Sequence, residues 1–191
     1  KFKSILESVV YYTVIDKIAT NITERTFALW CRDVRNIITV EDLDCFVKNT
    51  IIPTVNDWKL DNKSNFLRLG LNSMQQYRIK FILGKITAYV DALKLGKTTV
   101  EDLTTYTETA VEIEHIMPQT CTDKELYGMD EEEFAVYINR LGNLTLLENT
   151  INRSIQNDVY ANKATYYKQS KFYIPASISE LVNLGQYTAI N

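Results

Sequence analysis

The 191-residue sequence has few residues of the kinds that form tight turns, breaks or cross-links: six glycines, three prolines and three cysteines. The scarcity of glycine and proline argues against a fibrous or low-complexity protein. Cys31, Cys45 and Cys121 are odd in number and far apart, so they predict neither a disulfide framework nor a paired-cysteine zinc site. A reducing, cytoplasmic location is the simplest expectation.

Long apolar runs are also absent. Charged residues interrupt every apolar run well before membrane-spanning length, and the N-terminal residues lack the pattern of a signal peptide. We therefore expect no membrane association. The length suits one domain or two small ones with a buried core, and the first residue, Lys1, is compatible with a piece of a longer protein.

The net charge is only −3, but it is unevenly distributed. Residues 1–100 contain fifteen basic and ten acidic residues, and residues 134–171 contain five basic and two acidic residues. Residues 101–133 contain eleven acidic residues and one lysine. The two basic parts could contact phosphates, although charge taken alone is explained more simply by an uneven solvated surface.

The first hundred residues are predicted to be helical. The clearest helix covers residues 73–95, where Ser73 and Gln76 have the spacing of a capping box. Its apolar side chains recur at three- and four-residue steps and form one stripe: Met74, Tyr77, Phe81, Ile82, Ile86, Tyr89, Val90 and Leu93.

Shorter helices are expected before this long one. Their approximate ranges are 3–19, 24–36 and 40–51. Thr39 and Asp42 supply start signals for the third of them, and Pro53 is expected to help to end it.

After residue 100 the pattern changes to short elements. We expect, in order, a strand at 111–115, a short helix capped by Asp130 and Glu133, a turn at Gly142-Asn143, a second strand at 144–147 and a helix from about Asn149. The sequence therefore predicts an α+β protein that is mainly helical. Residues 1–100 would form a helical subdomain, and residues 101–191 a second subdomain.

The only histidine, His115, ends the first expected strand and directly follows Glu114. Asn143 and Asn152 come later, nine positions apart, in the turn and in the helix after the second strand. An isolated Glu-His pair is more often surface decoration than a site, and asparagine is ordinary in turns and on solvated helices. All of them in this order and context are much less expected by chance.

These residues resemble the HNH, or ββα-metal, nuclease motif, and the HNH domain of CRISPR effector nucleases has the same order. The stretches EIEHIMPQ (112–119), RLGNLTLL (140–147) and INRSIQNDVYANKATYYKQS (151–170) are similar to the C-terminal nuclease domain of GmrSD-type modification-dependent restriction enzymes. The resemblance implies that residues 101–191 form an HNH nuclease subdomain, a ββα-metal motif with a C-terminal helix. The N-terminal helical bundle, residues 1–100, would act as a linker or support DNA binding.

The resemblance also implies a divalent-metal-dependent DNA endonuclease. His115 would activate water, because a neutral imidazole suits a general base near pH 7. Glu114 and Asn152 would hold Mg²⁺ or Mn²⁺, which prefer oxygen ligands, and Asn157 is an alternative ligand. Asn143 would brace the long loop. Successive strand residues face opposite ways, so the carboxylate and the imidazole can converge only if the strand ends or bends there.

Two departures from the motif bear on the metal. Asn152 stands where histidine is common, which favours one hard cation. Glu114 stands where the CRISPR domain has aspartate, and its extra methylene group shifts the metal by about a bond length.

Basic residues after the motif are candidates for contact with the DNA backbone near the cleaved bond. These residues are Arg153, Lys163, Lys168 and Lys171. The lysines could equally serve solubility, and the Tyr166-Tyr167 pair between them is expected to lie in the core.

The resemblance implies double-stranded, modified phage DNA as substrate and a ParB-like nucleotide-hydrolysing domain on the N-terminal side. No glycine-rich phosphate loop occurs in these 191 residues. Two alternatives remain open. One is a non-catalytic helical DNA- or protein-binding module, favoured by the acidic stretch 101–133, which would repel a phosphate backbone. The other is a ribonuclease, because hydrolysis by activated water does not depend on the 2′-hydroxyl group.

Overall fold

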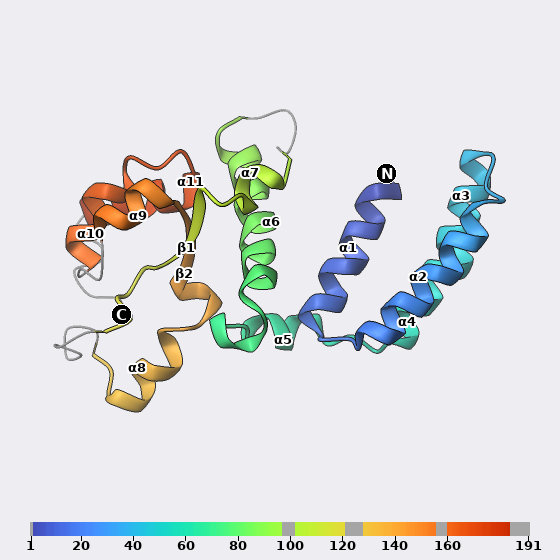
Figure 1. Ribbon diagram of the computed structural model, residues 1–191, viewed down its shortest axis with the longest axis horizontal. Helices are drawn as coiled ribbons and strands as arrows, with labels where there is room; N and C mark the ends of the chain where they lie inside the picture. Colours follow the sequence, from blue (N-terminus) through green and yellow to red (C-terminus); the bar gives the residue numbers. More distant parts are fainter. Residues whose placement is uncertain (1, 97–101, 121–127, 156–159, 184–191) are drawn as a thin grey trace. The chain divides into compact units, whose positions relative to one another are not determined.

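The computed structural model describes residues 2–96, 102–120, 128–155 and 160–183. Contacts divide the chain into two compact units, Lys1–Leu69 and Gly70–Asn191, and each is described by itself. Within the described ranges no helix is both long enough and apolar enough to cross a lipid bilayer. Figure 1 labels the elements in chain order.

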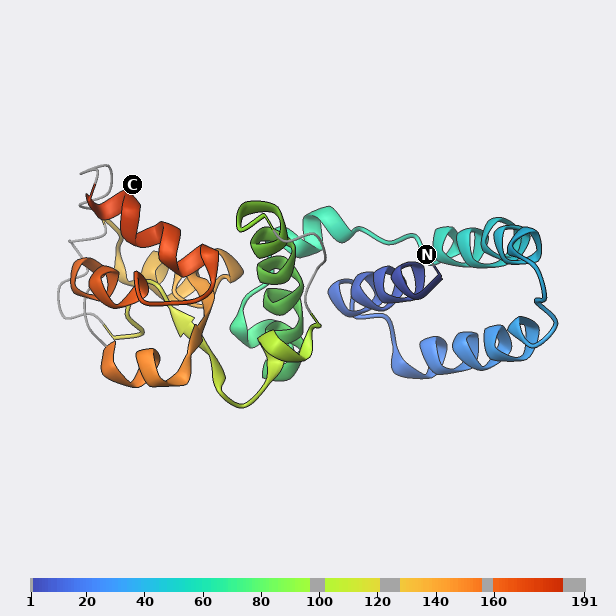
Figure 2. The same cartoon turned by 90° about the horizontal axis from the view of Figure 1, so that it is seen from above.

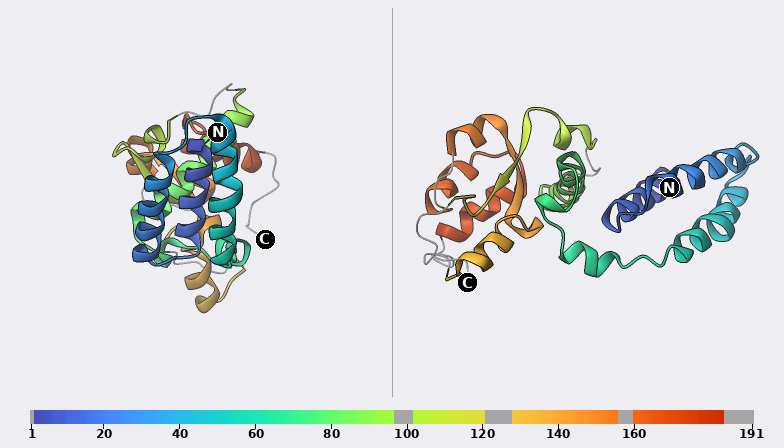
Figure 3. Two further views of the ribbon diagram at one scale, coloured as in Figure 1. Left: turned by 90° about the vertical axis from the view of Figure 1, so that its right-hand side faces the viewer. Right: turned by 60° about the horizontal axis from the view of Figure 1, so that its bottom comes forward.

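The first unit is entirely helical in its described part. Its elements are α1 (Phe2–Ile15), α2 (Thr20–Val34), α3 (Val40–Phe46), the π-helical turn η1 (Val47–Ile51), α4 (Ile52–Asp57) and α5 (Asn62–Leu67). Three helical rods, namely α1, α2 and the α3–α4 run, lie side by side (Figure 3, left). Val9, Trp30 and Ile51, one from each rod, form the centre of an apolar and aromatic core.

The third rod confirms one sequence prediction and contradicts another. Thr39 and Asp42 mark the start of α3 as predicted, and they form a capping box, in which each side chain accepts a hydrogen bond from the other's backbone N–H. Pro53 does not end the helix, which continues to Asp57. Proline lacks the N–H that an α-helix would use. The preceding π-helical turn η1 changes the hydrogen-bond pattern just before the proline, so the helix continues although Pro53 has no N–H to donate.

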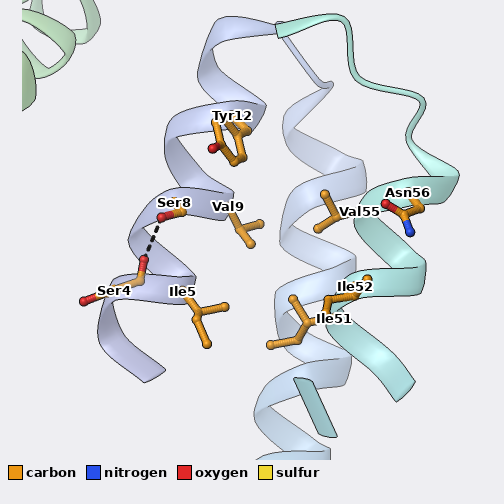
Figure 4. Close-up of a pocket in the computed structure, with 9 residues that line it drawn as sticks. All are labelled: Ser4, Ile5, Ser8, Val9, Tyr12, Ile51, Ile52, Val55 and Asn56. Atoms are coloured by element: carbon orange, nitrogen blue, oxygen red, sulfur yellow. Dashed lines mark hydrogen bonds between the residues drawn. The ribbon is translucent and has the colours of Figure 1, made fainter. Parts of the chain in front are cut away.

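A pocket of about 340 Å³ lies between α1 and α4 of this unit (Figure 4). Ile5, Val9, Ile51 and Val55 supply apolar side chains to it, and Ser8 donates a hydrogen bond back to its own helix. None of the lining residues is acidic, basic or histidine. The pocket is therefore a packing groove without groups for acid–base or metal chemistry.

The second unit contains a two-stranded sheet and most of the remaining helices. Its elements are η2 (Leu71–Ser73), α6 (Gln76–Lys94), α7 (Thr104–Thr107), β1 (Val111–His115), α8 (Glu131–Tyr137), η4 (Leu141–Asn143), β2 (Leu144–Glu148), α9 (Asn149–Ile155), α10 (Tyr160–Tyr167) and α11 (Tyr173–Asn183). The strands are antiparallel, with Val111 opposite Glu148 and His115 opposite Leu144. The hairpin lies between α6 and the C-terminal helices (Figures 1 and 2), and α11 also contacts α6.

The long helix α6 differs from the predicted helix in its first residue and in the face that is buried. It begins at Gln76, and the Ser73 hydroxyl accepts a hydrogen bond from Gly70 N instead of capping α6. Its buried residues are Ile79, Ile82, Leu83, Gly84, Thr87, Ala88 and Asp91, whereas Tyr77, Tyr89 and Leu93 of the predicted stripe are exposed. Asp91 can be buried because Tyr106 Oη and Tyr173 N donate hydrogen bonds to its carboxylate.

The chain enters the second unit through a close backbone approach. Gly70 forms an isolated β-bridge with Arg140, and Leu71 N donates a hydrogen bond of 2.6 Å to Asn139 O. A Cβ atom on residue 70 would overlap the backbone of Asn139, so glycine is required for space. Asn139 is thus fixed through its main chain.

The observed architecture confirms the predicted class, α+β and mainly helical, and both strands lie where the sequence places them. The capping box of Asp130 and Glu133 at the start of α8 is also confirmed. Contacts divide the chain after Leu69, and α6 packs with the hairpin unit. The sequence predicts a boundary at residue 100, between a helical subdomain and the subdomain of the motif, and this boundary stays a prediction.

Candidate functional site

Strand β1 directs neighbouring side chains to two different groups of partners. Glu112 and Glu114 contact residues of α9 and α10, whereas His115 contacts Asn139 and Gln119. This follows from the alternation of side chains along a strand, and β1 stays paired with β2 up to His115. Regular pairing ends at His115. The strand must end or bend there if the Glu114 carboxylate and the His115 imidazole are to converge.

His115 is buried, with 6% of its surface exposed. Its Nε2 lies 3.4 Å from Asn139 Oδ1, and its Nδ1 lies 3.1 Å from Gln119 Nε2. Gln119 Nε2 also lies 3.4 Å from Nε2 of the ring. Because an amide oxygen only accepts and an amide NH₂ only donates, the Asn139 contact and the shorter Gln119 contact favour the tautomer with the proton on Nε2. In that tautomer Nδ1 is the basic nitrogen, and Gln119 donates to it.

Burial lowers the pKa of His115 below its ordinary value. The hydrogen bond to Asn139 and the charge of Glu114 oppose this effect, and the positive charge of Lys163 adds to it. The imidazole is therefore neutral at pH 7, which is the form that can take a proton from water.

Asn143 lies at the end of η4, immediately before β2, and is 8% exposed. Its Oδ1 accepts a hydrogen bond of 2.8 Å from Met117 N, and its Nδ2 donates one of 2.7 Å to Ile138 O. One side chain thereby joins the segment after β1 to the end of α8. These contacts are the ones that a loop-bracing role requires.

Glu114 belongs to a buried cluster with two residues of α10. Lys163 Nζ donates a hydrogen bond of 2.6 Å to Glu114 Oε1 and another of 2.6 Å to His115 O. Tyr167 Oη donates to the same carboxylate oxygen at 3.1 Å. Lys163 is 1% exposed and Glu114 is 7% exposed. This burial does not favour the phosphate contact that the sequence predicts for Lys163.

Asn152 lies on α9, which packs across both strands as the sequence predicts. Its Nδ2 donates a hydrogen bond of 2.8 Å to Glu112 Oε2. Arg153 lies 4.0 Å from the other oxygen of Glu112, and its side chain is 75% exposed. The Asn152 amide therefore contacts Glu112 and not Glu114, which lies two positions later on the same side of β1.

Glu112, Glu114 and Asn152 carry the oxygen atoms on this side of β1 that could serve as cation ligands. Among the described residues, no side chain donates a hydrogen bond to Glu114 Oε2, which leaves one oxygen of a buried carboxylate for a ligand. Glu112 supplies a second carboxylate, and Asn152 Oδ1 supplies an amide oxygen. Oxygen donors of this kind suit Mg²⁺ or Mn²⁺, which keep several waters. The described residues contain no group of three or more histidine, cysteine, aspartate or glutamate side chains placed to hold a metal.

The remaining predicted residues lie on the surface or outside the described ranges. Lys168 and Lys171 are exposed, and Lys171 Nζ lies 5.2 Å from the centre of the Phe172 ring. Tyr167 is buried as expected, whereas Tyr166 is 37% exposed. Asn157 lies outside the described residues.

Sequence reasoning assigned no role to four residues that contact the predicted ones, namely Glu112, Gln119, Asn139 and Tyr167. Glu112 could have been found, because it lies two positions before Glu114 and so shares its side of a strand. Tyr167 lies four positions after Lys163, one helical turn away. Asn139 had no such signal, since it contacts His115 only through the folded chain.

A comparison with protein families identifies the family of the chain. Residues 55–189, more than half of the chain, match the family described as GmrSD restriction endonucleases, C-terminal domain. No curated protein matches the chain. The match spans the strand–turn–strand–helix segment with its histidine, acidic residues and asparagines, and the chain therefore belongs to the family of the C-terminal domain of GmrSD restriction endonucleases.

Proposed function

We propose that this chain is the cleavage module of a modification-dependent restriction enzyme, a divalent-metal-dependent HNH endonuclease that hydrolyses phosphodiester bonds of double-stranded DNA. Family membership supports a nuclease of the restriction type. The observation that argues most for the chemistry is the buried His115 at the end of β1, directly after Glu114 in the chain, with an amide partner at each ring nitrogen.

His115 acts as the general base in this proposal. Asn139 Oδ1 accepts a hydrogen bond from Nε2–H, and this favours the tautomer in which Nδ1 is unprotonated. Gln119 is exposed, and its amide lies where a hydrogen-bond donor approaches Nδ1. A water molecule that takes the place of this amide gives its proton to Nδ1 as it attacks the phosphorus atom.

Glu114 and Asn152 would hold the cation, with Glu112 as an adjacent oxygen donor that sequence reasoning did not assign. When bound, Mg²⁺ or Mn²⁺ supplies positive charge to the leaving 3′ oxygen. Asn143 keeps the loop after β1 in place, so that the imidazole and the carboxylate stay at the end of the strand.

The substrate and partner follow from the same family. Arg153 and Lys168 are exposed on α9 and just after α10, where they can contact the DNA backbone. We propose modified phage DNA as the substrate and a ParB-like nucleotide-hydrolysing domain on the N-terminal side as the partner that senses the modification. The cytoplasm, where phage DNA enters, is the proposed location.

The decisive experiment is plasmid cleavage by the chain, alone and joined to its N-terminal domain, with Mg²⁺, Mn²⁺ or a chelator. We expect cleavage that requires the metal and is reduced about 10²- to 10⁴-fold by His115→Ala, because general bases contribute about that much. The variant's unfolding temperature controls for folding. Equal cleavage by wild type and His115→Ala would refute the assignment, and matched RNA substrates test the ribonuclease alternative.

One observation favours a second candidate, a non-catalytic DNA-binding module. Asn139 and Gln119 contact the nitrogens of His115, and Lys163 and Tyr167 contact Glu114. These contacts could simply stabilise the fold. DNA binding without cleavage by any wild-type form, with either metal, would support this candidate.

A further inference from the structure

The second unit buries a lysine that the proposed reaction does not use. Lys163, on α10, is 1% exposed. Taking an ammonium group out of water costs several kcal/mol unless it is paired and hydrogen-bonded, so such residues are rare in cores. A buried ion pair is seldom more stabilising than apolar residues of similar volume. A role beyond stability is therefore worth seeking.

The two acceptors of Lys163 belong to the two residues at the centre of the proposed site. One is the side-chain oxygen Oε1 of Glu114, and the other is the backbone oxygen of His115, both at 2.6 Å. Glu114 and His115 direct their side chains to different partners. A single ammonium group thus fixes the carboxylate of one and the main chain of the other, at the point where β1 ends.

Tyr167, one helical turn after Lys163, completes the arrangement. Its hydroxyl donates to the same oxygen, Oε1, at 3.1 Å. With both donors on Oε1, the rotation of the carboxylate about its last bond is fixed. Its other oxygen, Oε2, has no hydrogen-bond donor among the described residues. The cluster therefore presents one defined oxygen for a cation.

We propose that Lys163 is a positioning residue for the proposed metal site: it orients Glu114 toward the cation and holds the end of β1 so that His115 and Glu114 keep their relative placement. This inference rests on the proposed function. It replaces the phosphate contact that the sequence predicts for Lys163, because a residue 1% exposed cannot reach a DNA backbone without breaking both hydrogen bonds.

The test compares Lys163→Met with Lys168→Met, which removes an exposed lysine just after the same helix. For each variant we would measure kcat and KM for plasmid DNA, the salt dependence of KM, the unfolding temperature, and Mn²⁺ binding without DNA by electron paramagnetic resonance. For Lys163→Met we expect a fall in kcat and in Mn²⁺ affinity of about 10- to 100-fold, as for residues that orient metal ligands, with KM unchanged. For Lys168→Met we expect mainly a higher KM with a shallower salt dependence.

Three results would overturn the proposal. A higher KM with unchanged kcat in Lys163→Met would indicate a phosphate contact. A lower unfolding temperature with unchanged kcat and Mn²⁺ affinity would indicate a purely structural role. Tighter Mn²⁺ binding would show that the ammonium acts through its charge alone, because removing a positive charge beside a carboxylate favours a cation there.

The design also separates this inference from the proposed function. If wild type cuts no DNA but binds Mn²⁺, weaker binding by Lys163→Met still supports the positioning role. If wild type binds no Mn²⁺, both fail. If Lys163→Met does not fold, Lys163→Cys in a background with Cys31, Cys45 and Cys121 changed to serine can be treated with bromoethylamine. This rebuilds a lysine-like side chain. Recovery of kcat and Mn²⁺ affinity is expected, and a refolded, alkylated protein that recovers its unfolding temperature but not its Mn²⁺ affinity would overturn the positioning role.

Discussion

The two units of this protein form their cores in different ways. The first unit packs Val9, Trp30 and Ile51 with further apolar and aromatic side chains. The second unit also buries ionisable groups, among them Asp91, Glu114, His115 and Lys163. Since the first unit has an extensive core of apolar and aromatic packing, burial of charge is not a requirement for a core in this chain. The buried cluster of Glu114, Lys163 and Tyr167 therefore needs an explanation beyond packing.

The largest expected effect comes from breaking the buried ion pair. Glu114→Gln leaves the Lys163 ammonium buried without a counter-charge and is expected to cost about 3–5 kcal/mol in the free energy of unfolding. Metal-dependent cleavage should be lost as well. Denaturant unfolding and plasmid cleavage would measure the two effects. The double variant Glu114→Gln, Lys163→Met should recover stability but not cleavage, and recovery of both would contradict the proposed role of Glu114.

The matching experiment in the first unit is Trp30→Ala. It removes a large, 4% exposed side chain from an apolar core and should cost about 3–5 kcal/mol of that unit's stability. The kcat of the folded variant should not change, because Trp30 supports no residue of the proposed site. A fall in kcat comparable with that of Glu114→Gln would show that the first unit takes part in catalysis directly.

Asn143→Ala tests a neutral buried side chain of the second unit. The change leaves Met117 N and Ile138 O without their partner, so we expect a loss of about 1–3 kcal/mol in unfolding free energy. The kcat should fall too, since the loop after β1 loses its brace. Thr145→Val, at another buried position one residue into β2, provides the control, because within the described ranges its hydroxyl forms a hydrogen bond only with the carbonyl of the next residue, Leu146.

The smallest expected effect is on pH dependence. The pKa of His115 is lower in the folded protein than in the unfolded chain, so folding favours the neutral ring. This contribution to stability is present above the unfolded pKa of about 6.5 and is lost as the pH falls toward the folded value. Unfolding temperatures of the metal-free protein between pH 8 and pH 5 should show the loss. It should be absent in His115→Gln, and an equal slope in both proteins would assign it elsewhere.

Sequence periodicity predicted both strands and most helices, because alternation and three- to four-residue spacing are local properties. It failed where the local pattern did not determine the outcome. Tyr77, Tyr89 and Leu93 fit an apolar stripe of α6, yet the buried face of that helix includes Asp91, which tertiary hydrogen bonds from Tyr106 and Tyr173 satisfy. Pro53 lies within a helical rod because the preceding turn is π-helical.

The candidate site shows the same limit. The motif selects Glu114, His115, Asn143 and Asn152, and the structure gives Asn143 the contacts of a brace. The partners of these residues were harder to predict. Lys163 was expected at the surface because lysines usually are, and its burial depends on two acceptors 48 and 49 residues away in sequence. Asn139 lies after α8, 24 residues from His115 in sequence, and no helical or strand periodicity relates residues so far apart.

The backbone around Gly70 ties the entrance of the second unit to the imidazole. The chain arrives at that glycine, touches the main chain of Asn139, and the side chain of Asn139 in turn holds His115. A methyl group at position 70 would push this asparagine aside, and the ring would lose the partner that selects its tautomer. A single residue, Asn139, therefore connects the start of the second unit to the Nε2 side of the His115 ring, opposite the basic nitrogen.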